Sequence, residues 1–452
     1  MKEDDMSQWR RMGNLKIVLV ILVVFLIGVL IGSGQYQKVS ALSNSTFEEL
    51  KLFSDVIYII QKDYVEETKS KDLIYGAIKG MLETLDPHSG FMPPNMFKDM
   101  QDETKGRFEG IGIGITIKEG VLTVEGSPIE DTPAFKAGIQ SGDQILKIEG
   151  EPTKNLSLFE AVKRIRGQKG TKVTITIMRE GFTQPQDFTL TRDVIPVRSV
   201  RYELLEKSYG YIRISQFQEK TDSEFDKAMK ALEEESKGNL KGLVLDLRNN
   251  PGGLLDQAVK VADHFVGSGI IVSIDGRREE QRQKWVAHPE PIATRYPLVV
   301  LVNNGSASGS EIVAGAIQDH GRGILVGTQT FGKGSVQTII PLKDGSGLRL
   351  TTARYYTPNG RSIQAKGIVP DIIVKPLRPE EEKEVVTPTP QQVLEKDLER
   401  HLIEVEKGVP KEKEKPKKGE GKEKKPADNQ LERALELLKS WDIFKNIAKG
   451  NK

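Results

Sequence analysis

The strongest constraint on the fold is an apolar, strand-like run that leads through a turn of small residues into a helix-like run. The first run is Tyr296-Pro-Leu-Val-Val-Leu-Val-Asn303, the turn is Gly305-Ser-Ala-Ser-Gly-Ser310, and the helix-like run begins at Glu311. A turn of this kind holds a serine hydroxyl away from the backbone, beside the free N–H groups at the start of a helix. The segment therefore predicts an α/β arrangement with a serine at its strand-to-helix turn.

A serine in this position needs a base to remove its proton, and the nearest downstream histidine is poorly placed for that role. His320 lies further along the same predicted helix, roughly 18 Å away at 1.5 Å per residue. Lysine is the alternative, because a neutral amine can take the serine proton once burial lowers its pKa. Lys333 fits this requirement, since it lies between two glycines and close to the apolar Phe331 and Val336. The residues thus favour a Ser-Lys pair over a local Ser-His pair.

Two motifs, NNGSASGSEIVAGAIQD and GTQTFGKGSVQ, and the spacing between them resemble those of the carboxy-terminal processing (tail-specific) proteases. These are Ser-Lys peptidases that carry a PDZ domain. The resemblance implies Ser308 as the nucleophile, Lys333 as the general base and Gln337 as the group that orients the lysine. Without the resemblance, Ser306 and Ser310 remain rival nucleophiles.

The same resemblance implies an oxyanion hole built from backbone N–H groups of two loops. An apolar, strand-like run from Leu243 ends in Arg248-Asn-Asn-Pro-Gly-Gly253, and adjacent glycines let a backbone turn its N–H groups toward a ligand. Gly252 or Gly253 would supply one donor and Gly309 the other, and the sequence does not choose between the first two. At position 309 this chain has glycine where the family more often has alanine. Glycine keeps the backbone N–H donor, and the difference affects the rigidity of the turn.

Composition excludes several other classes of protein. Lys and Arg number 66 against 64 Asp and Glu, so a net charge of +2 gives no case for nucleic-acid binding. The chain has no cysteine, which removes disulfides and thiolate chemistry. Its five histidines are scattered and include no HExxH motif, so neither a metal nor an organic cofactor is expected.

The N-terminus carries a candidate membrane segment. Residues 15–33 include a nearly unbroken apolar run, which follows Arg10, Arg11 and Lys16. Basic residues ahead of a single apolar segment predict a cytoplasmic N-terminus, residues 1–14, and an exported remainder. We expect a single-pass protein of the inner (cytoplasmic) membrane with its catalytic part on the periplasmic or extracellular side. Val39-Ser40-Ala41 leaves a cleaved, soluble form open.

The remaining chain divides by pattern and composition. We predict a helical region that packs or dimerises (46–106), a disordered linker rich in Pro, Glu and Lys (376–429), and a helix that docks on a partner or on its own chain (430–448). Residues 107–192, which contain EGIGIGITI and GIQSGDQILKIEG, resemble a PDZ domain, and the family resemblance implies that residues 193–375 form the peptidase core. His88, in the segment LDPHSGFMPP, is interpreted as structural rather than as a ligand. Whether copies of the chain associate stays open.

The predicted PDZ domain supplies a way to recognise substrates. Its helix should begin with a capping box formed by Ser157 and Glu160. In a PDZ domain, a loop such as Gly110-Ile111-Gly112-Ile113 offers N–H groups to a peptide's terminal carboxylate, and Ile111 and Ile113 would shape an apolar pocket. We therefore expect protein substrates with apolar C-termini. An activating peptide or adaptor protein is left open, as is a bridge from Arg164 or Arg166 to the catalytic core.

Together these features predict an α/β catalytic core, a mixed sheet with flanking helices, into which a β-rich PDZ domain is inserted behind an N-terminal helical segment and one transmembrane helix. The predicted function is that of an exported serine endopeptidase with a Ser-Lys dyad. One alternative is a non-catalytic PDZ scaffold that only binds peptides. Another is a trypsin-like Ser-His-Asp PDZ protease, but there the protease domain precedes the PDZ domain and the nucleophile lies in GNSGG, which this sequence lacks.

Overall fold

The computed structural model describes residues 44–118, 120–289, 296–377, 394–398, 400, 402 and 428–450. The predicted membrane segment, residues 15–33, lies outside these ranges. Within them, no helix combines the length and the apolar character needed to cross a bilayer. The chain forms two compact units, one ending at Ala77 and the other beginning at Ile78.

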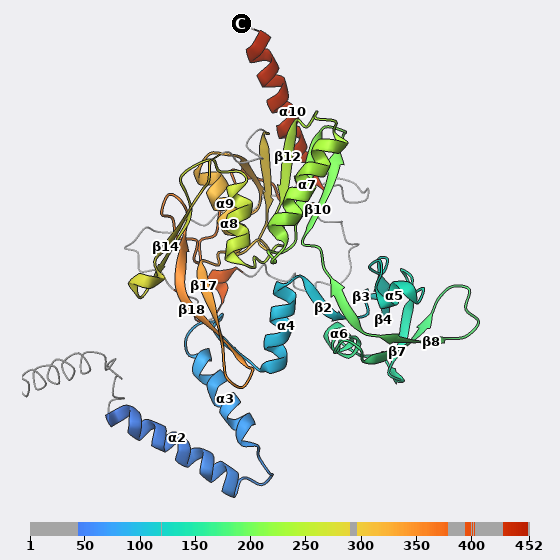
Figure 1. Ribbon diagram of the computed structural model, residues 1–452, viewed down its shortest axis with the longest axis vertical. Helices are drawn as coiled ribbons and strands as arrows, with labels where there is room; N and C mark the ends of the chain where they lie inside the picture. Colours follow the sequence, from blue (N-terminus) through green and yellow to red (C-terminus); the bar gives the residue numbers. More distant parts are fainter. Residues whose placement is uncertain are drawn as a thin grey trace, which may run out of the picture. The chain divides into compact units, whose positions relative to one another are not determined.

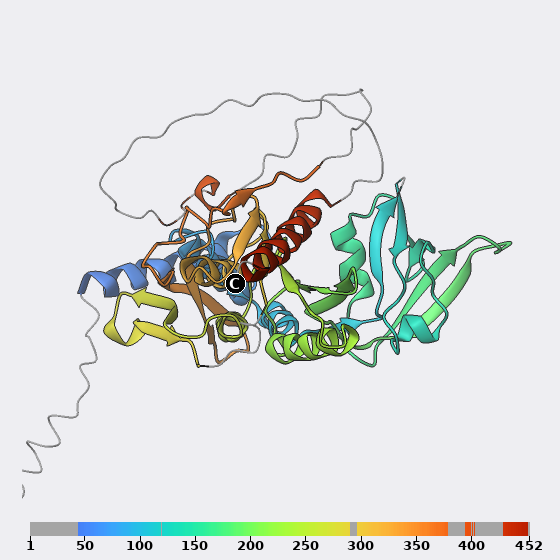
Figure 2. The same cartoon turned by 90° about the horizontal axis from the view of Figure 1, so that it is seen from above.

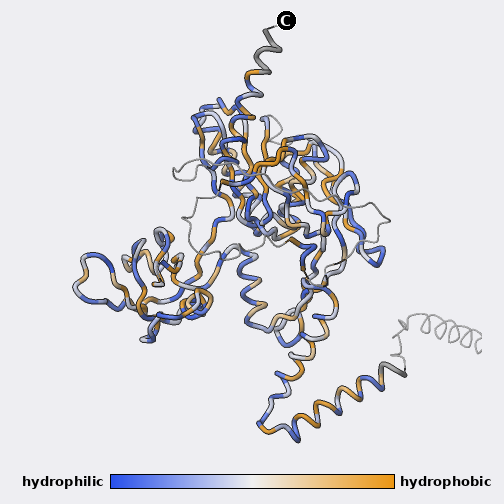
Figure 3. The backbone as a smooth tube through the Cα atoms, turned by 180° about the vertical axis from the view of Figure 1, so that it is seen from behind, coloured by the Kyte–Doolittle hydropathy of each residue, from blue (hydrophilic) through white to orange (hydrophobic). Residues whose placement is uncertain are grey.

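The described residues of the N-terminal unit, 44–77, are mostly helical, as the apolar periodicity predicts. Helix α2 spans Asn44–Asp63, and α3 (Ser70–Glu83) begins in this unit and ends in the second. Several large apolar side chains of α2 are exposed to solvent, among them Phe47 and Leu52. Apolar and polar positions alternate along this helix in Figure 3.

A six-stranded sheet forms the centre of the second unit (Figure 1). Its strands, in spatial order, are β10 (Val200–Leu205), β11 (Tyr209–Ile214), β12 (Gly242–Asp246), β15 (Leu298–Val302), β16 (Ile324–Gly327) and β19 (Ile372–Ile373). β10 runs antiparallel to β11, and all other pairs are parallel. β12 and β15 are apolar throughout or nearly so because both of their faces are buried. The sheet is mixed, as predicted.

Helices cover both faces of this sheet. Three of them pack on one face: α7 (Thr221–Glu235), α8 (Leu255–Asp263) and α9 (Gly309–Asp319). The C-terminal helix α10 (Asn429–Gly450) packs on the other face, against β12, β15 and β16 (Figure 2). Alternation along β12 explains the two layers, since Leu245 points to the first set of helices and Val244 to α10. The predicted C-terminal helix thus docks on its own chain.

A second sheet, which the sequence analysis did not separate from the first, carries the lysine motif. It contains β1 (Gly90–Met92), β13 (Ile270–Gly276), β14 (Gln283–Val286), β17 (Ser335–Pro341) and β18 (Gly347–Tyr356), all paired antiparallel. A short 3₁₀ helix η1 (Glu279–Gln281) connects β13 to β14, and α4 (Pro94–Thr104) follows β1. Lys333 lies just before β17, and its neighbour Gly334 accepts a backbone hydrogen bond from Tyr355 of β18 at 2.7 Å.

The segment predicted as a PDZ domain is β-rich. β2 (Arg107–Gly110) pairs with β9 (Asp193–Pro196), and a further sheet contains β3 (Gly114–Lys118), β4 (Val121–Glu125), β5 (Gln144–Ile148), β6 (Glu151–Pro152), β7 (Lys172–Met178) and β8 (Gln186–Thr191). Helix α5 spans Pro133–Lys136 and α6 spans Leu158–Ile165. The capping box that starts α6 is confirmed, because Ser157 and Glu160 exchange side-chain and backbone hydrogen bonds at 3.2 and 3.0 Å.

One short segment departs from the predicted disordered linker, residues 376–429. Residues 394–398 pack on the catalytic core, and Glu395–Asp397 form a 3₁₀ helix, η3. Glu395 is fully buried and pairs with His88. Composition did not reveal this segment, because residues 376–429 are polar as a whole. A single buried carboxylate can anchor a few residues without changing that composition.

Candidate active site

Ser308 occupies the junction between β15 and α9, where the sequence predicted a strand-to-helix turn. It is the residue that caps α9, with φ of 51° and ψ of −109°. A positive φ is costly for a residue with a Cβ and persists only where surrounding contacts enforce it. Burial raises the pKa of Tyr355 to about 12, against a lowering effect of the Ser308 hydroxyl, so the tyrosine remains neutral. Tyr355 was not among the predicted site residues.

The two rival serines have buried hydroxyls that are already engaged. Ser306 Oγ donates to the carbonyl of Leu247 at 2.8 Å, and Ser310 Oγ donates to the carbonyl of Asn250 at 2.9 Å. Both side chains are fully buried, whereas Ser308 is partly exposed. Of these three serines, Ser308 is therefore the one whose hydroxyl a substrate can reach.

A buried carboxylate joins the serine loop to the lysine loop. Glu311 Oε2 accepts hydrogen bonds from the backbone N–H of Ser308 at 2.8 Å and from that of Lys333 at 2.9 Å. Its other oxygen, Oε1, accepts from Gly332 N–H at 2.8 Å and from the Thr330 hydroxyl at 2.5 Å. One side chain thus fixes the backbone of both predicted catalytic residues.

The environment of Glu311 makes its charge sensitive to pH. Burial raises its pKa to about 7, against the lowering effect of the hydrogen bonds from Thr330 and three backbone N–H groups. Sequence reasoning treated Glu311 only as the start of a helix. The pattern Ser308-x-x-Glu311 does signal a capping interaction, but a capping signal says nothing of a second loop far along the chain.

Lys333 is largely withdrawn from solvent between two buried glycines, as predicted. Burial is the main cause that lowers its pKa, and the guanidinium of Arg349 lowers it further. The carboxylates of Glu395, Glu311 and Asp86 act in the opposite direction. A lowered pKa increases the fraction of neutral amine near neutral pH, which is the form that can accept a proton.

Gln337 lies near this site but makes its hydrogen bonds elsewhere. Its Nε2 donates to Ser335 Oγ at 2.9 Å and to Thr351 Oγ1 at 3.4 Å. The pairing of β17 with β18 shifts register between Val336 and Gln337, and such a bulge redirects the side chain that follows it. The expectation that Gln337 orients Lys333 therefore stays a prediction.

Gly252, the first of the two glycines after β12, lies directly against the serine, and Gly253 lies against the backbone of Phe217. A Cβ added to Gly252, whose φ is 103°, would lie 2.8 Å from Ser308 Cβ and 2.9 Å from Gly309 N. The N–H of Gly252 already donates to Asn250 Oδ1 at 2.9 Å. By contrast, among the hydrogen bonds of the described residues, none uses the N–H of Gly253 or of Gly309. This geometry favours Gly253 over Gly252 as the partner of Gly309.

Packing explains why residue 309 is a glycine. An added Cβ would approach Cδ2 of the fully buried Phe217 to 2.9 Å and the Cβ of Ala258 to 3.2 Å. The close approach of α9 to Phe217 thus leaves little room for the alanine that is more frequent in the family. The turn is held by these contacts rather than by a side chain at position 309.

Histidine and metal chemistry find no support in the described ranges. Each histidine there bonds to a partner other than Ser308, namely His88 to Glu395, His264 to Asp222, His288 to Asp263, and His320 to the carbonyl of Ile270. The same ranges contain no group of three or more side chains placed to hold a metal ion.

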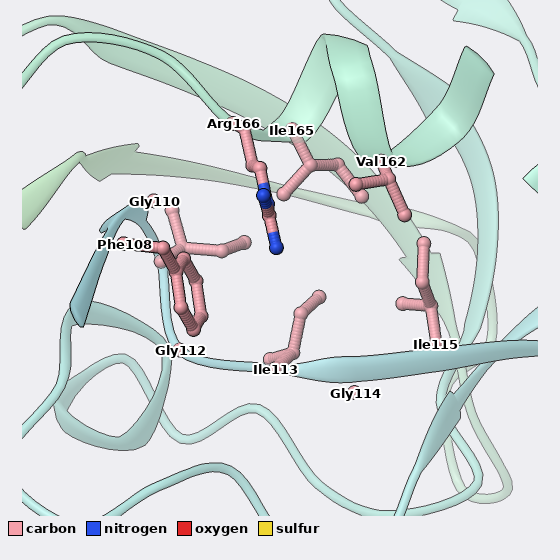
Figure 4. A pocket seen from close by; sticks show the side chains of 10 residues that line it. Phe108, Gly110, Gly112, Ile113, Gly114, Ile115, Val162, Ile165 and Arg166 are labelled. Atoms are coloured by element: carbon pink, nitrogen blue, oxygen red, sulfur yellow. The ribbon is translucent and has the colours of Figure 1, made fainter. Parts of the chain in front are cut away.

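The loop Gly110–Ile113 borders a groove between β3 and α6, shown in Figure 4. β3 is an edge strand of its sheet, so one of its sides is open to an added strand. The groove has a volume of about 220 Å³ and an apolar lining that includes Ile113, Ile115, Val162 and Ile165. Ile111 belongs to the core beneath, with 1% of its surface exposed. The structure therefore brings the predicted substrate-binding residues to one groove.

Arg164 and Arg166 occupy different positions at the end of α6. Arg164 pairs with Glu151 on the same domain. Arg166 extends into the groove and stacks over the ring of Phe108, with 4.9 Å between its Cζ and the ring centroid (Figure 4). A cation beside an open strand edge is suited to the carboxylate at a peptide's end.

Comparison with known proteins agrees with this arrangement. Family models match peptidase family S41 over residues 208–374, a PDZ domain over residues 102–178 and the activating protease CtpB N-terminal domain over residues 31–95. The carboxy-terminal-processing protease of Bartonella bacilliformis is 47% identical over 81% of this chain and 84% of its own length. The carboxy-terminal processing protease CtpA of Bacillus subtilis is 39% identical over 74% of this chain and 70% of its own length.

Among solved structures, the photosystem II D1 C-terminal processing protease aligns with 72% of this chain and 92% of its own, with 31% identity and a TM-score of 0.43. The match to the Bartonella protein alone, at 47% identity over most of both chains, exceeds what unrelated proteins share. The chain therefore belongs to peptidase family S41 and is a PDZ-containing serine protease of the carboxy-terminal processing type.

Proposed function

We propose that this protease cleaves peptide bonds through a dyad of Ser308 and Lys333. The neutral amine of Lys333 takes the proton of the Ser308 hydroxyl while Oγ attacks the carbonyl carbon of the substrate. The C–N bond then breaks as the lysine ammonium returns the proton to the leaving amine. Water hydrolyses the resulting ester, again with Lys333 as the base, and frees Ser308.

The observation that carries this proposal is the shared acceptor, Glu311 Oε2. Because one oxygen holds the backbone of both Ser308 and Lys333, the serine and the lysine loops are fixed close together before substrate binds. The burial that lowers the pKa of Lys333 supports its role as a base. The partly exposed Ser308, set against the engaged Ser306 and Ser310, supports its role as the nucleophile.

Stabilisation of the developing oxyanion is assigned to the N–H groups of Gly253 and Gly309. Both groups lack an internal acceptor in the part of the chain that the structure describes, and Gly309 starts helix α9. Free N–H groups at a helix start carry partial positive charge, which suits an oxyanion. Gln337 is proposed to orient Lys333 once substrate is bound. To do so, its side chain would give up its present hydrogen bonds to Ser335 and Thr351.

We also propose that the groove between β3 and α6 binds the C-terminus of a protein substrate. The peptide would add a strand to the open edge of β3, with its last side chain among the apolar residues of the groove. The loop Gly110–Ile113 and Arg166 would hold the terminal carboxylate. Substrates with apolar C-termini follow from this lining. An activating peptide or an adaptor protein with the same kind of C-terminus would enter the same groove.

The cellular setting is part of the proposal. The apolar run within residues 15–33 and the basic residues before it support a single-pass anchor in the cytoplasmic membrane, with the catalytic part exported. The exposed apolar side chains of α2 support association between copies of the chain. Fractionation of cells and protease treatment of spheroplasts test the anchor; recovery of the full-length chain in the soluble cytoplasm would refute it.

The enzymatic proposal is tested on a protein with an apolar C-terminus. Wild type should cleave it, while Ser308→Ala and Lys333→Ala should each reduce cleavage by several orders of magnitude. A matched substrate ending in aspartate should be cleaved more slowly. Equal cleavage by wild type and both variants would sink the dyad. Binding of the peptide without cleavage by wild type would favour a scaffold.

A further inference from the structure

Glu395 lies in a short segment that returns to the catalytic core beyond its last strand. Residues 394–398, which we call the latch segment, follow β19 in the chain and contain the helix η3. The side chain of Glu395 is fully buried, whereas the neighbouring Lys396 and Asp397 are exposed. A buried carboxylate on an otherwise polar segment is costly unless several groups satisfy it.

The hydrogen bonds of Glu395 reach the lysine loop at residues before and after Lys333 in the chain. Its backbone N–H donates to the carbonyl of Phe331 at 3.1 Å. Its Oε1 accepts from Gln364 Nε2 at 2.8 Å, and Gln364 Oε1 accepts in turn from the N–H of Gly334 at 3.0 Å. The latch segment thus holds the lysine loop directly at Phe331 and through one amide at Gly334.

His88 contacts the same carboxylate. Its Nε2 lies 2.7 and 2.8 Å from the two oxygens of Glu395. The backbone of His88 is held by Asp86, which accepts from its N–H at 2.9 Å, and by Arg349, which donates to its carbonyl at 2.8 Å. This agrees with the prediction that His88 is structural, and it connects the segment before β1 to the lysine loop.

We propose that the latch segment completes the active site and that Glu395 is a positioning residue for Lys333. This inference rests on the proposed function, in which Lys333 is the base. The backbone N–H of Glu395 holds the lysine loop at Phe331, its carboxylate holds the loop through Gln364, and its negative charge acts on the lysine. The catalytic unit of this protease therefore extends beyond the last strand of the core to residue 398.

The charges around Lys333 give the proposal a signature that a purely structural role lacks. Arg349 lowers the pKa of Lys333, while Glu395, Glu311 and Asp86 raise it. Loss of the Glu395 charge should therefore lower the pKa of Lys333 further. The acidic limb of the pH–rate profile, where the lysine becomes protonated, should then shift to lower pH.

The test compares Glu395→Gln with Glu224→Gln in the full-length protein. Glu395→Gln keeps the size of the side chain and removes its charge. Glu224→Gln makes the same change in α7, outside the active site, at a carboxylate that accepts backbone N–H groups from Ser199 at 2.9 Å and Val200 at 3.2 Å. We expect Glu395→Gln to reduce kcat by about tenfold to a hundredfold with little change in KM, and to shift the acidic limb to lower pH. Glu224→Gln should match wild type.

Thermal denaturation of each variant accompanies the kinetics. A Glu395→Gln protein that is folded and keeps the wild-type kcat and acidic limb would overturn the proposal, as would a loss of activity with an unmoved limb. Replacement of residues 394–398 by Gly and Ser provides a second measurement, and wild-type activity of that variant would also overturn it. Lys333→Ala separates the two levels, because an active Lys333→Ala enzyme would refute the dyad itself.

Discussion

Glu311 Oε2 accepts the backbone N–H of Ser308 and the backbone N–H of Lys333, at 2.8 and 2.9 Å. Ser308 lies in the loop that follows β15 of the mixed six-stranded sheet, and Lys333 precedes β17 of the antiparallel sheet. The proposed nucleophile and its proposed base therefore come from two sheets that one buried carboxylate joins.

The first prediction concerns this carboxylate. Glu311→Gln should lower kcat by roughly a hundredfold. The NH₂ group of glutamine would replace one of the two oxygens of Glu311, so it would face two hydrogen-bond donors without being able to accept from them. Glu224→Gln is the matched control, since Glu224 also clamps backbone in this unit, with its Oε2 accepting from Ser199 at 2.9 Å and from Val200 at 3.2 Å. Steady-state kinetics should show a lower kcat for Glu311→Gln and little change for Glu224→Gln. The reverse order would contradict the proposal that Glu311 positions the two loops.

The second prediction concerns pH. Activity should rise with pH on the acidic side, because the neutral amine of Lys333 and the ionised form of Glu311 are both required. Burial raises the pKa of Glu311 to about 7, so below that pH a proton occupies an oxygen that must accept N–H groups. Burial also lowers the pKa of Lys333, which brings its deprotonation toward the same range. A profile of kcat/KM that stays flat from about pH 6 to pH 9 would refute both requirements.

The third prediction concerns Gly309, which follows the proposed nucleophile. Gly309→Ala should reduce activity, because the added methyl group meets the ring of Phe217 at 2.9 Å and displaces the start of α9. Phe217→Leu should relieve the contact, so the double variant should recover part of the activity lost by Gly309→Ala. Additive losses in the two variants would argue that Gly309 serves another purpose.

The fourth prediction concerns the C-terminal helix. Leu438 of α10 is 2% exposed and packs in the same cluster as Val244 and Leu301. Leu438→Ala should reduce the free energy of unfolding by about 2–4 kcal/mol. Ile443→Ala, on the same helix at a side chain that is 60% exposed, should have little effect. Thermal or denaturant unfolding compares the two, and equal stability would show that α10 is not part of the core.

Sequence motifs were sufficient to propose those parts of the candidate site that lie in local runs of residues. Ser308 and Lys333 each sit in a run of glycines and small residues, so their loops were visible from the chain alone. The role of Glu311 was hidden because its partners Gly332 and Lys333 lie on another sheet, and no local pattern reports such a contact. The same holds for Tyr355, which reaches Ser308 from β18.

The fold was predictable to a similar extent. Apolar runs such as Leu298–Val302 identified the buried parallel strands, and the periodicity of the last segment identified α10. The sequence left open where α10 docks, because a stripe of apolar residues fits a partner as well as the chain's own sheet. Residues 394–398 were assigned to a disordered linker, since a single buried Glu395 has no signature in composition.

The most direct test of the dyad is labelling by a fluorophosphonate, which reacts with an activated serine without need of a peptide substrate. The rate of inactivation is measured against pH for wild type and Lys333→Ala, and mass spectrometry locates the label. We predict a single label on Ser308, a rate for wild type that rises with pH, and a rate for Lys333→Ala that is slower by about a hundredfold or more. A label on Ser306 or Ser310, or equal rates for the two proteins, would contradict a Ser308–Lys333 dyad.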